Sequence, residues 1–513
     1  MTNAFSLFRA LAVYGICLPL AIFLGYLLAT PDDMGTEFTI GVVATALTIP
    51  IFLRWHHPFL VLAWNMGAVM FFLPGRPAIF LPACLISFTI SILQYTLNRN
   101  LKFTNVPAVT WPLLALVGVA LVTAHFTGGI GLKVTGSASY GGKRYLSITA
   151  AVAGYFALTA KRVPVAQAPL YVKLYLLSGL SSMIAGLSNV VGSGFYWIFL
   201  MFPGDPMGFQ AASTSVIGDL GGGILRMGWL SSACGPVVAS LLAFYGLSGI
   251  LDLRHPWRLI LFVLFAGASL LGGFRSILIA FMVTLLLQFY FEGLFRSRVL
   301  PAFILMAILG SAMILPFTNK LPLSVQRAIS FLPVDIDPTA AMDAEGSTEW
   351  RLLMWQRALP EVPNHLLLGK GYAIDPSALE MANLQNMRVM MDPYEGAFMA
   401  GDYHSGPLSV ILTFGLGGTL AFLWFLYGAT KTLYHYYANG SPELKKINTY
   451  LLVAFITKIF MFFFIFGSLY SDILSFAGLI GLGISLNGAV HVPAPAPVAR
   501  QVFHRFRLAN APR

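Results

Sequence analysis

Apolar runs long enough to cross a lipid bilayer recur along nearly the whole chain, and this feature restricts the possible folds more than any other. Each run has roughly 17–25 residues, which is the length that a helix needs to cross a hydrocarbon core about 30 Å thick. The runs number about fourteen. We therefore predict an all-α, polytopic integral membrane protein with about fourteen transmembrane helices and one long loop.

The composition supports this class. Apolar residues make up 57% of the chain and charged residues only 10%, and the mean hydropathy is +0.77. A soluble protein of 513 residues would carry far more charge on its surface. The net charge of +11 does not indicate a nucleic-acid partner, because the cations gather in the connections on one side of the predicted spans.

The cysteines and the N-terminus add two expectations. Cys17, Cys84 and Cys234 lie inside or beside apolar runs, so we expect small core residues and no disulfide framework or cysteine metal site. The run from Leu11 to Thr30 is longer than the apolar part of a typical signal peptide and follows a single cation, Arg9. It predicts a retained first span.

The distribution of lysine and arginine predicts how the chain is threaded. Cytoplasmic loops are enriched in these residues. One set of connections holds most of them: the N-terminus, RWHH, NRNLK, KRVPVAQAPLYVK, DLRHPWR, EGLFRSR, the segment 431–446 and the C-terminal tail. The acidic stretch TPDDMGTE, without a cation, lies on the other side. We expect both termini of this multi-pass membrane protein in the cytoplasm.

These spans divide the chain into four parts. Residues 1–316 would form an N-terminal bundle of about eleven spans. Residues 317–407 would form a long periplasmic or outer loop, residues 408–490 a three-span unit, and residues 491–513 a basic cytoplasmic tail. Residues 170–202 are too long for one span and too short for two ordinary spans, so a re-entrant or interfacial piece stays open there.

The long loop carries a predicted amphipathic helix near residues 347–360. Ser347 is the expected N-cap and Pro360 ends the helix. At the i, i+3, i+4, i+7 spacing of a helix, four side chains would share one face: Trp350, Leu353, Met354 and Arg357. The helix would lie at the headgroup boundary, where a lipid-linked substrate arrives, or would simply pack on the membrane domain.

Three cations and one histidine are candidates for the chemistry. Arg226 and Arg275 stand at the outer ends of apolar runs, and Lys458 lies deep inside one. Each is either functional or an interfacial residue whose charge reaches the headgroups. Arginine suits phosphate because its planar fork forms two parallel charge-assisted hydrogen bonds. His404, at the end of the long loop, is a candidate to take a proton from an attacking hydroxyl, or a structural residue.

The sequence contains two short acidic motifs that resemble metal-binding motifs of transferases. Asp335-Ile336-Asp337 has the spacing of nucleotide-sugar transferases, and Asp32 and Asp33 resemble the acidic pair of polyprenyl-phosphate-sugar transferases. The histidines form no HxxxH or HExxH arrangement, and the sequence has no Walker A motif.

A longer pattern surrounds His404. His404-Ser405 is followed after nine residues by Gly415 and after two more by Gly418, which fits H-[NSQ]-x9-G-x-x-G. Upstream stand Arg351, Trp355, Ala358, Pro363 and Gly369-Lys370-Gly371-Tyr372, an R–W–P–GxG succession. From about Trp350 to Leu426 the chain resembles the bacterial O-antigen ligase and O-antigen (exopolysaccharide) polymerase superfamily, with its Wzy-type C-terminal domain.

This resemblance implies a GT-C-like, inverting glycosyltransferase that uses an undecaprenyl-diphosphate-linked glycan and needs no metal or cofactor. His404 would be the catalytic residue, and Arg275 and Arg226 would bind the diphosphate. After Arg226 the sequence departs from the family, with SSACGP where Asn-Pro-Asn is common. The supporting residues would be Ser405, Gly415, Gly418, Arg351 and Tyr403.

The acceptor would be a lipid A core or another glycan, so ligase and polymerase both stay open. Two other classes also remain. A polyprenyl-phosphate-sugar transferase would depend on Asp32, Asp33 and a divalent cation. A flippase or exporter of lipid-linked glycans would use the basic groups for transport alone.

Overall fold

The protein is seen in a computed structural model, which describes residues 34–73, 75–98, 103–131, 141–187, 193–195, 197–203, 226–375 and 401–489. It also describes positions 19, 21, 22, 25, 224, 377, 398 and 399. Most of the predicted first span, Cys17, the pair Asp32 and Asp33, and the basic tail 491–513 lie outside these residues.

The described chain is helical throughout, with 16 α-helices and a single isolated β-bridge between Val69 and Ala78. Seven stretches of described helix are long and apolar enough to cross a membrane. They are α3 (Phe80–Leu97), α4 (Pro107–Thr127), Val165–Gly186, α10 (Gly228–Ile250), α18 (Gly406–Asn439), Pro442–Phe464 with α19 (Lys445–Phe464), and α20 (Leu469–Asn487). The prediction of an all-α polytopic membrane protein is confirmed, and the total of about fourteen spans stays a prediction.

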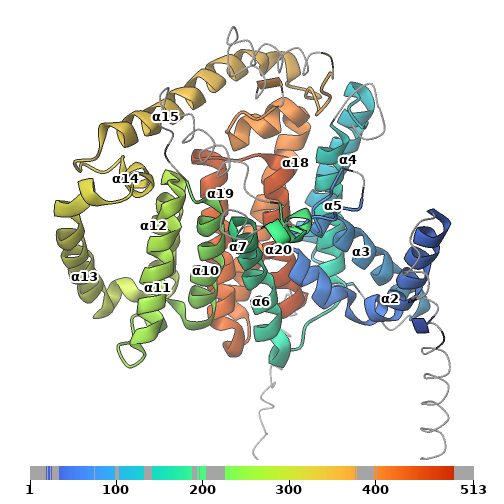
Figure 1. Ribbon diagram of the computed structural model, residues 1–513, viewed down its shortest axis with the longest axis horizontal. Coiled ribbons are helices and arrows are strands. Elements are labelled where there is room, and N and C mark those ends of the chain that lie inside the picture. Colours follow the sequence, from blue (N-terminus) through green and yellow to red (C-terminus); the bar gives the residue numbers. More distant parts are fainter. Residues whose placement is uncertain are drawn as a thin grey trace, which may run out of the picture.

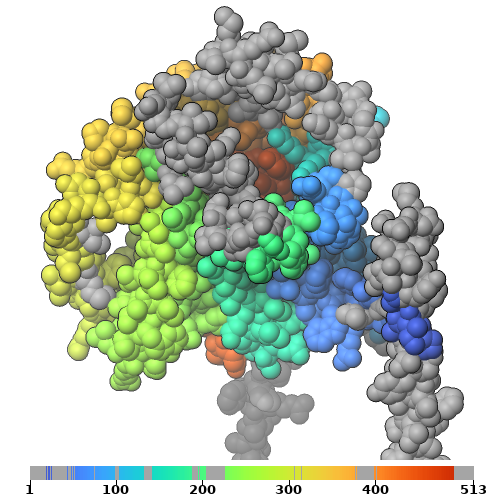
Figure 2. Space-filling view, in the orientation of Figure 1, coloured from blue at the N-terminus to red at the C-terminus, as the bar shows by residue number. Residues whose placement is uncertain are grey.

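Further helices complete the bundle. Three shorter apolar ones are α11 (Pro256–Ser269), α12 (Arg275–Phe291) and α13 (Val299–Ile314). Helices α2 (Met34–Ala63) and α5 (Gly142–Thr159) belong to the N-terminal part of the bundle. Helices α18, α19 and α20 occupy the middle of the bundle (Figure 1). Helix α13 stands apart, and Figure 2 shows an open gap between it and α12.

The expectation for one short polar segment is wrong. The segment RWHH at 54–57, expected as a turn, lies inside α2. Its histidines point into the bundle, where His57 Nε2 donates to the Leu158 carbonyl at 3.0 Å and His56 Nδ1 lies 2.8 Å from Ser87 Oγ. Because these polar groups find partners inside, the helix continues through them.

The stretch 170–202 resolves into one long helical segment followed by short pieces. Helices α6 (Ala168–Leu177) and α7 (Ser182–Gly186) form one candidate span with the 3-10 turns beside them. After it, the described residues contain only the turn Ser193–Phe195 and the four-residue helix α8 (Ile198–Met201).

A helical layer covers the end of the bundle where α12 and α18 begin. Helix α14 (Leu323–Ile329) leads into α15 (Pro338–Ala358), which runs across the tops of the bundle helices (Figure 1). The predicted N-cap at Ser347 is wrong, because α15 begins earlier. Asp337 caps it by accepting from the Thr339 N–H at 2.8 Å, and Pro338 occupies the first helical position.

The face of α15 that turns inward is also not the predicted one. Leu353 and Arg357 are exposed, whereas Met354 is buried. The inward stripe instead carries Asp343, Ser347 and Arg351 at a spacing of four residues, as well as Trp350. Helix α15 therefore turns a polar, charged face toward the bundle.

Candidate functional site

His404 stands in a tight turn immediately before α18. Its φ is +49°, a left-handed conformation that histidine adopts more readily than most residues, and Gly401 in the same turn has a φ of +67°. Ser405 then returns to an extended conformation and α18 begins at Gly406. The turn lifts the His404 side chain off the axis of α18 and toward α15.

Two aromatic rings fix the orientation of the His404 imidazole. The Trp350 ring lies with its centroid 4.3 Å from the imidazole at an angle of 79°, and the Phe466 ring lies at 4.8 Å and 65°. These edge-to-face contacts come from α15 on one side and from the α19–α20 connection on the other. On the third side, His404 Nδ1 lies 3.2 Å from Asp402 Oδ1.

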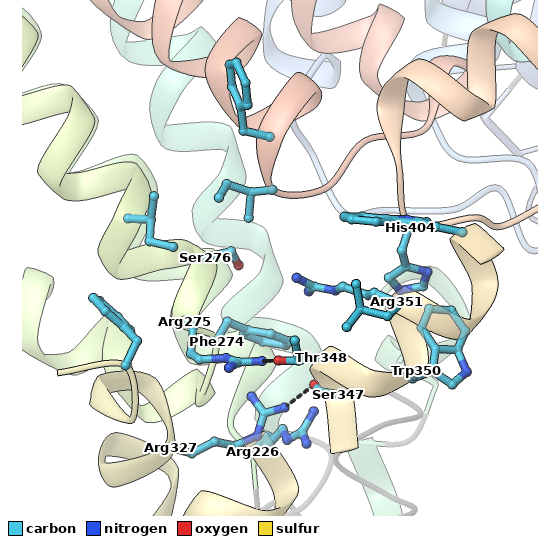
Figure 3. A pocket seen from close by; sticks show the side chains of 16 residues that line it. Arg226, Phe274, Arg275, Ser276, Arg327, Ser347, Thr348, Trp350, Arg351 and His404 are labelled. Atoms are coloured by element: carbon cyan, nitrogen blue, oxygen red, sulfur yellow. Dashed lines mark hydrogen bonds between the residues drawn. The ribbon is translucent and has the colours of Figure 1, made fainter. Parts of the chain in front are cut away.

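Arg275 is the first residue of α12 and points toward α15. Its Nη2 donates to the Ala344 carbonyl at 2.8 Å and to Thr348 Oγ1 at 2.9 Å (Figure 3). Arg226, just before α10, pairs with Asp343 at 2.6 Å. Both predicted arginines therefore contact the same helix, although they lie on different bundle helices.

A third arginine, which the sequence did not single out, joins them. Arg327 on α14 is buried and donates to Asp343, to the Gly273 carbonyl and, at 2.9 Å, to Ser347 Oγ. Burial opposes ionisation of Asp343, but the bonds from Arg327 and Arg226 outweigh it and hold the pKa of Asp343 below its ordinary value. Asp343 is thus a shared counter-ion for two arginines.

Arg351 supplies a fourth guanidinium. Burial, and then the charge of Arg327, lower its pKa, yet an arginine keeps its proton at neutral pH. Arg351 makes no hydrogen bond or ion pair with another residue that the structure describes. Its donors are therefore available to a ligand.

These groups line one cavity of about 510 Å³. Arg226, Arg275, Arg327, Arg351 and His404 all contribute to its wall, together with apolar side chains of α12, α15 and the end of α19. Figure 3 shows the Arg351 side chain reaching from α15 into the space beside His404. The volume falls within the range of small-molecule binding sites. Four guanidinium groups on the wall, of which two share the carboxylate of Asp343, leave the cavity strongly positive, which favours a multiply charged anion.

The remaining predicted residues surround the cavity rather than line it. Tyr403 is buried and points away, packing against Ala358, Leu408 and Leu412. Ser405 lies in a neighbouring apolar pocket of about 280 Å³ that also contacts His404. Both residues belong to the turn, and neither lines the wall of the main cavity.

Gly415 marks a break inside α18. Its φ of +61° interrupts the helix, and a Cβ there would come 2.5 Å from the Leu367 carbonyl oxygen. The break frees carbonyls that the GKGY segment uses: Lys370 N–H donates to the Leu412 oxygen at 2.8 Å, and Gly371 N–H to the Thr413 oxygen at 3.0 Å. The GKGY segment of the long loop is thus fastened to α18.

Gly418, three residues further, faces its own helix. A Cβ at Gly418 would collide with the Phe414 side chain, which the break at Gly415 turns toward it. Of the two motif glycines, Gly415 thus breaks α18, and Gly418 leaves room for the Phe414 side chain at that break.

Lys458 and the Asp335–Asp337 pattern fall outside the cavity. Lys458 Nζ lies 2.6 Å from Asp472 Oδ1, so the charge is paired across α19 and α20. Asp337 caps α15, and its bond from Thr339 lowers its pKa. Among the described residues, no group of three histidine, cysteine or acidic side chains has a geometry that could hold a metal ion.

No curated protein matches the chain. A family model described as O-antigen ligase matches residues 260–423, a segment that contains Arg275, Arg327, Arg351 and His404, while Arg226 precedes it. Over residues 260–423, this membrane protein is similar to the O-antigen ligase family.

Proposed function

We propose that the protein is a membrane glycosyltransferase that transfers or polymerises undecaprenyl-diphosphate-linked glycan at the outer face of the bacterial cytoplasmic membrane. The observation that carries this proposal is the cavity in which four arginines and His404 meet. The match to the O-antigen ligase family supports a lipid-linked glycan as substrate.

The arginines would hold the diphosphate of the donor. The N–H donors of Arg351 are available to phosphate oxygens. Arg275 uses only Nη2 for its two contacts with α15, so its other nitrogens are also available. As the bond between the sugar and the diphosphate breaks, negative charge grows on the leaving oxygen. Fixed guanidinium groups stabilise that charge without having to reorganise, which lowers the barrier. The leaving group is undecaprenyl diphosphate, and the proposed reaction needs no metal.

His404 would activate the acceptor hydroxyl. Its Nδ1 faces Asp402, which leaves Nε2 for the cavity. Nε2 would accept the hydroxyl proton while the acceptor oxygen bonds to the anomeric carbon on the face opposite the diphosphate. A single displacement of this kind inverts the anomeric centre.

The membrane would hold the polyprenyl tail. The cavity lies at the end of α12, and large apolar side chains of α12 and α13 are exposed, among them Met282, Leu286, Ile304 and Ile308. With the predicted threading, this end of the bundle faces the periplasm and the termini face the cytoplasm. That orientation is part of the proposal.

A deletion strain tests the function. Complementation with the wild type should restore a surface glycan, and complementation with His404→Ala should not, although the variant is present in the membrane. His435, a half-buried residue of α18 outside the cavity, provides the matched control as His435→Ala. Unattached long glycan chains in the deletion strain would indicate a ligase, whereas attached single units would indicate a polymerase.

The same strain separates the alternatives. Full restoration by His404→Ala would refute the proposed chemistry. A polyprenyl-phosphate-sugar transferase would lose transfer in membranes treated with EDTA and after Asp32→Asn or Asp33→Asn. A flippase or exporter would give no new glycosidic bond with purified protein and lipid-linked donor.

A further inference from the structure

Asp402 lies beside the nitrogen of His404 that faces away from the cavity. The two residues belong to one turn, and the positive φ values of Gly401 and His404 fold that turn back on itself. As a result His404 Nδ1 comes within 3.2 Å of Asp402 Oδ1. Nδ1 is shielded from solvent and makes no aligned hydrogen bond with a described residue, so the carboxylate is in ion-pair range and a small rotation would align the bond.

The surroundings keep Asp402 charged. Burial opposes its ionisation, but His404 and, further away, Arg144 outweigh burial and hold the pKa of Asp402 below its ordinary value. The Arg144 guanidinium lies over the Tyr470 ring at 4.7 Å and next to Gly401. The carboxylate is therefore an anion placed between a fixed cation and the imidazole.

The cavity makes such an anion necessary for the proposed reaction. Accepting the acceptor proton would give His404 a positive charge, and the charged groups on the cavity wall are Arg226, Arg275, Arg327 and Arg351. Their repulsion would oppose the transfer, and Asp343 is already shared by Arg226 and Arg327. Of the described acids, Asp402 is the one in direct contact with the ring.

We propose that Asp402 is a positioning residue that holds the His404 imidazole with Nδ1–H toward its carboxylate and Nε2 toward the acceptor hydroxyl. This inference rests on the proposed glycosyl transfer. In the step, the hydroxyl proton moves to Nε2, the new oxygen–carbon bond forms, and the carbon–oxygen bond to the diphosphate breaks. Asp402 keeps its charge and stabilises the imidazolium, in the way that a buried aspartate serves the histidine of a serine protease.

The test uses the purified full chain with a lipid-linked donor and compares wild type, Asp402→Asn and Asp335→Asn across pH. Asparagine keeps the shape of the side chain but removes its charge. We expect Asp402→Asn to lower kcat by at least about 100-fold and to change KM for the donor by less than about threefold. The acid limb of its kcat profile should move to lower pH, because the carboxylate no longer favours the protonated ring. Asp402→Glu should recover part of kcat.

The outcomes separate this inference from the function on which it rests. The pH at which kcat reaches half its maximum does not depend on how much of the variant is folded. A lower kcat with that pH unchanged would therefore indicate only a loss of folded protein, and it would overturn the proposal. A rise in donor KM at unchanged kcat would make Asp402 a donor-binding residue. If wild type transfers glycan, His404→Ala does not, and Asp402→Asn matches Asp335→Asn, only this inference fails. An inactive wild type would refute the proposed function itself.

Discussion

The indole Nε1 of Trp355 donates a hydrogen bond of 3.1 Å to the carbonyl oxygen of Tyr403. This bond ties α15 to the residue that precedes His404. The helix that carries Arg351 and contacts the other arginines is thereby fastened to the turn that carries the histidine. The distance between the two halves of the cavity thus depends on a short chain of contacts rather than on the lipid-facing helices.

Replacing Trp355 by phenylalanine should weaken this connection without emptying its place. The lost donor leaves the Tyr403 carbonyl unpaired, at a cost of about 1 kcal/mol, so we expect transfer to fall by about fivefold. Trp424→Phe, on an exposed face of α18, is the matched control and should keep full activity. Equal activity of both variants would show that the bond does not position His404.

Arg275→Lys should recover little of the activity that Arg275→Ala abolishes. A lysine ammonium is a point charge that cannot contact Ala344, Thr348 and a phosphate oxygen at the same time with the geometry of a guanidinium. We expect kcat/KM to fall by at least about tenfold, measured as transfer from a lipid-linked donor. Arg254→Lys, at an exposed position, controls for the change of cation. Near-full activity of Arg275→Lys would count against binding of the diphosphate by Arg275.

Asp343→Asn should lower thermal stability in detergent at neutral pH, since Arg226 and Arg327 lose their shared counter-ion. The pKa of Asp343 is lower in the folded state than its ordinary value. Its charge therefore stabilises the fold above about pH 4, the unfolded value, and this contribution is lost as the pH falls through the folded pKa. The difference in Tm between wild type and variant should shrink over that acid range. A constant difference would mean that the charge is not what stabilises the fold.

Gly415→Ala should destabilise the protein more than Gly417→Ala. An alanine at position 415 would hold a left-handed conformation, at a cost of about 1–2 kcal/mol, and its Cβ would press on the Leu367 carbonyl. At position 417 the nearest atom to a new Cβ is a Val119 methyl at 3.6 Å, so alanine fits. Thermal unfolding of the two variants measures the contrast. Equal Tm values would mean that the break in α18 is not needed.

Sequence alone predicted the parts of the site that carry a local signal. His404 was marked by its motif, and Arg275 and Arg226 were marked by charge at the ends of apolar runs. Arg327 carried no such signal, because an arginine in a polar loop is ordinary until the fold buries it beside Asp343. That burial depends on contacts between α12, α14 and α15, which are distant in the sequence.

The errors have local causes. Ser347 has the composition of an N-cap, but Asp337-Pro338 caps the same helix earlier and leaves Ser347 to accept from Arg327. At RWHH, three polar residues and a tryptophan between apolar runs resemble a turn. Inside the bundle, Ser87 and the Leu158 carbonyl each bind one ring nitrogen of these histidines, and a helix results. Partners of this kind cannot be seen from the sequence.

The contact between Lys458 and Asp472 has a consequence for how the chain enters the bilayer. A lone charge at the centre of a membrane helix costs about 3 kcal/mol on insertion. Here the two charges lie 2.6 Å apart on consecutive helices joined by a short connection, so each neutralises the other. Helices α19 and α20 are therefore expected to insert together, as one hairpin whose intramembrane charges cancel as a pair, rather than one after the other.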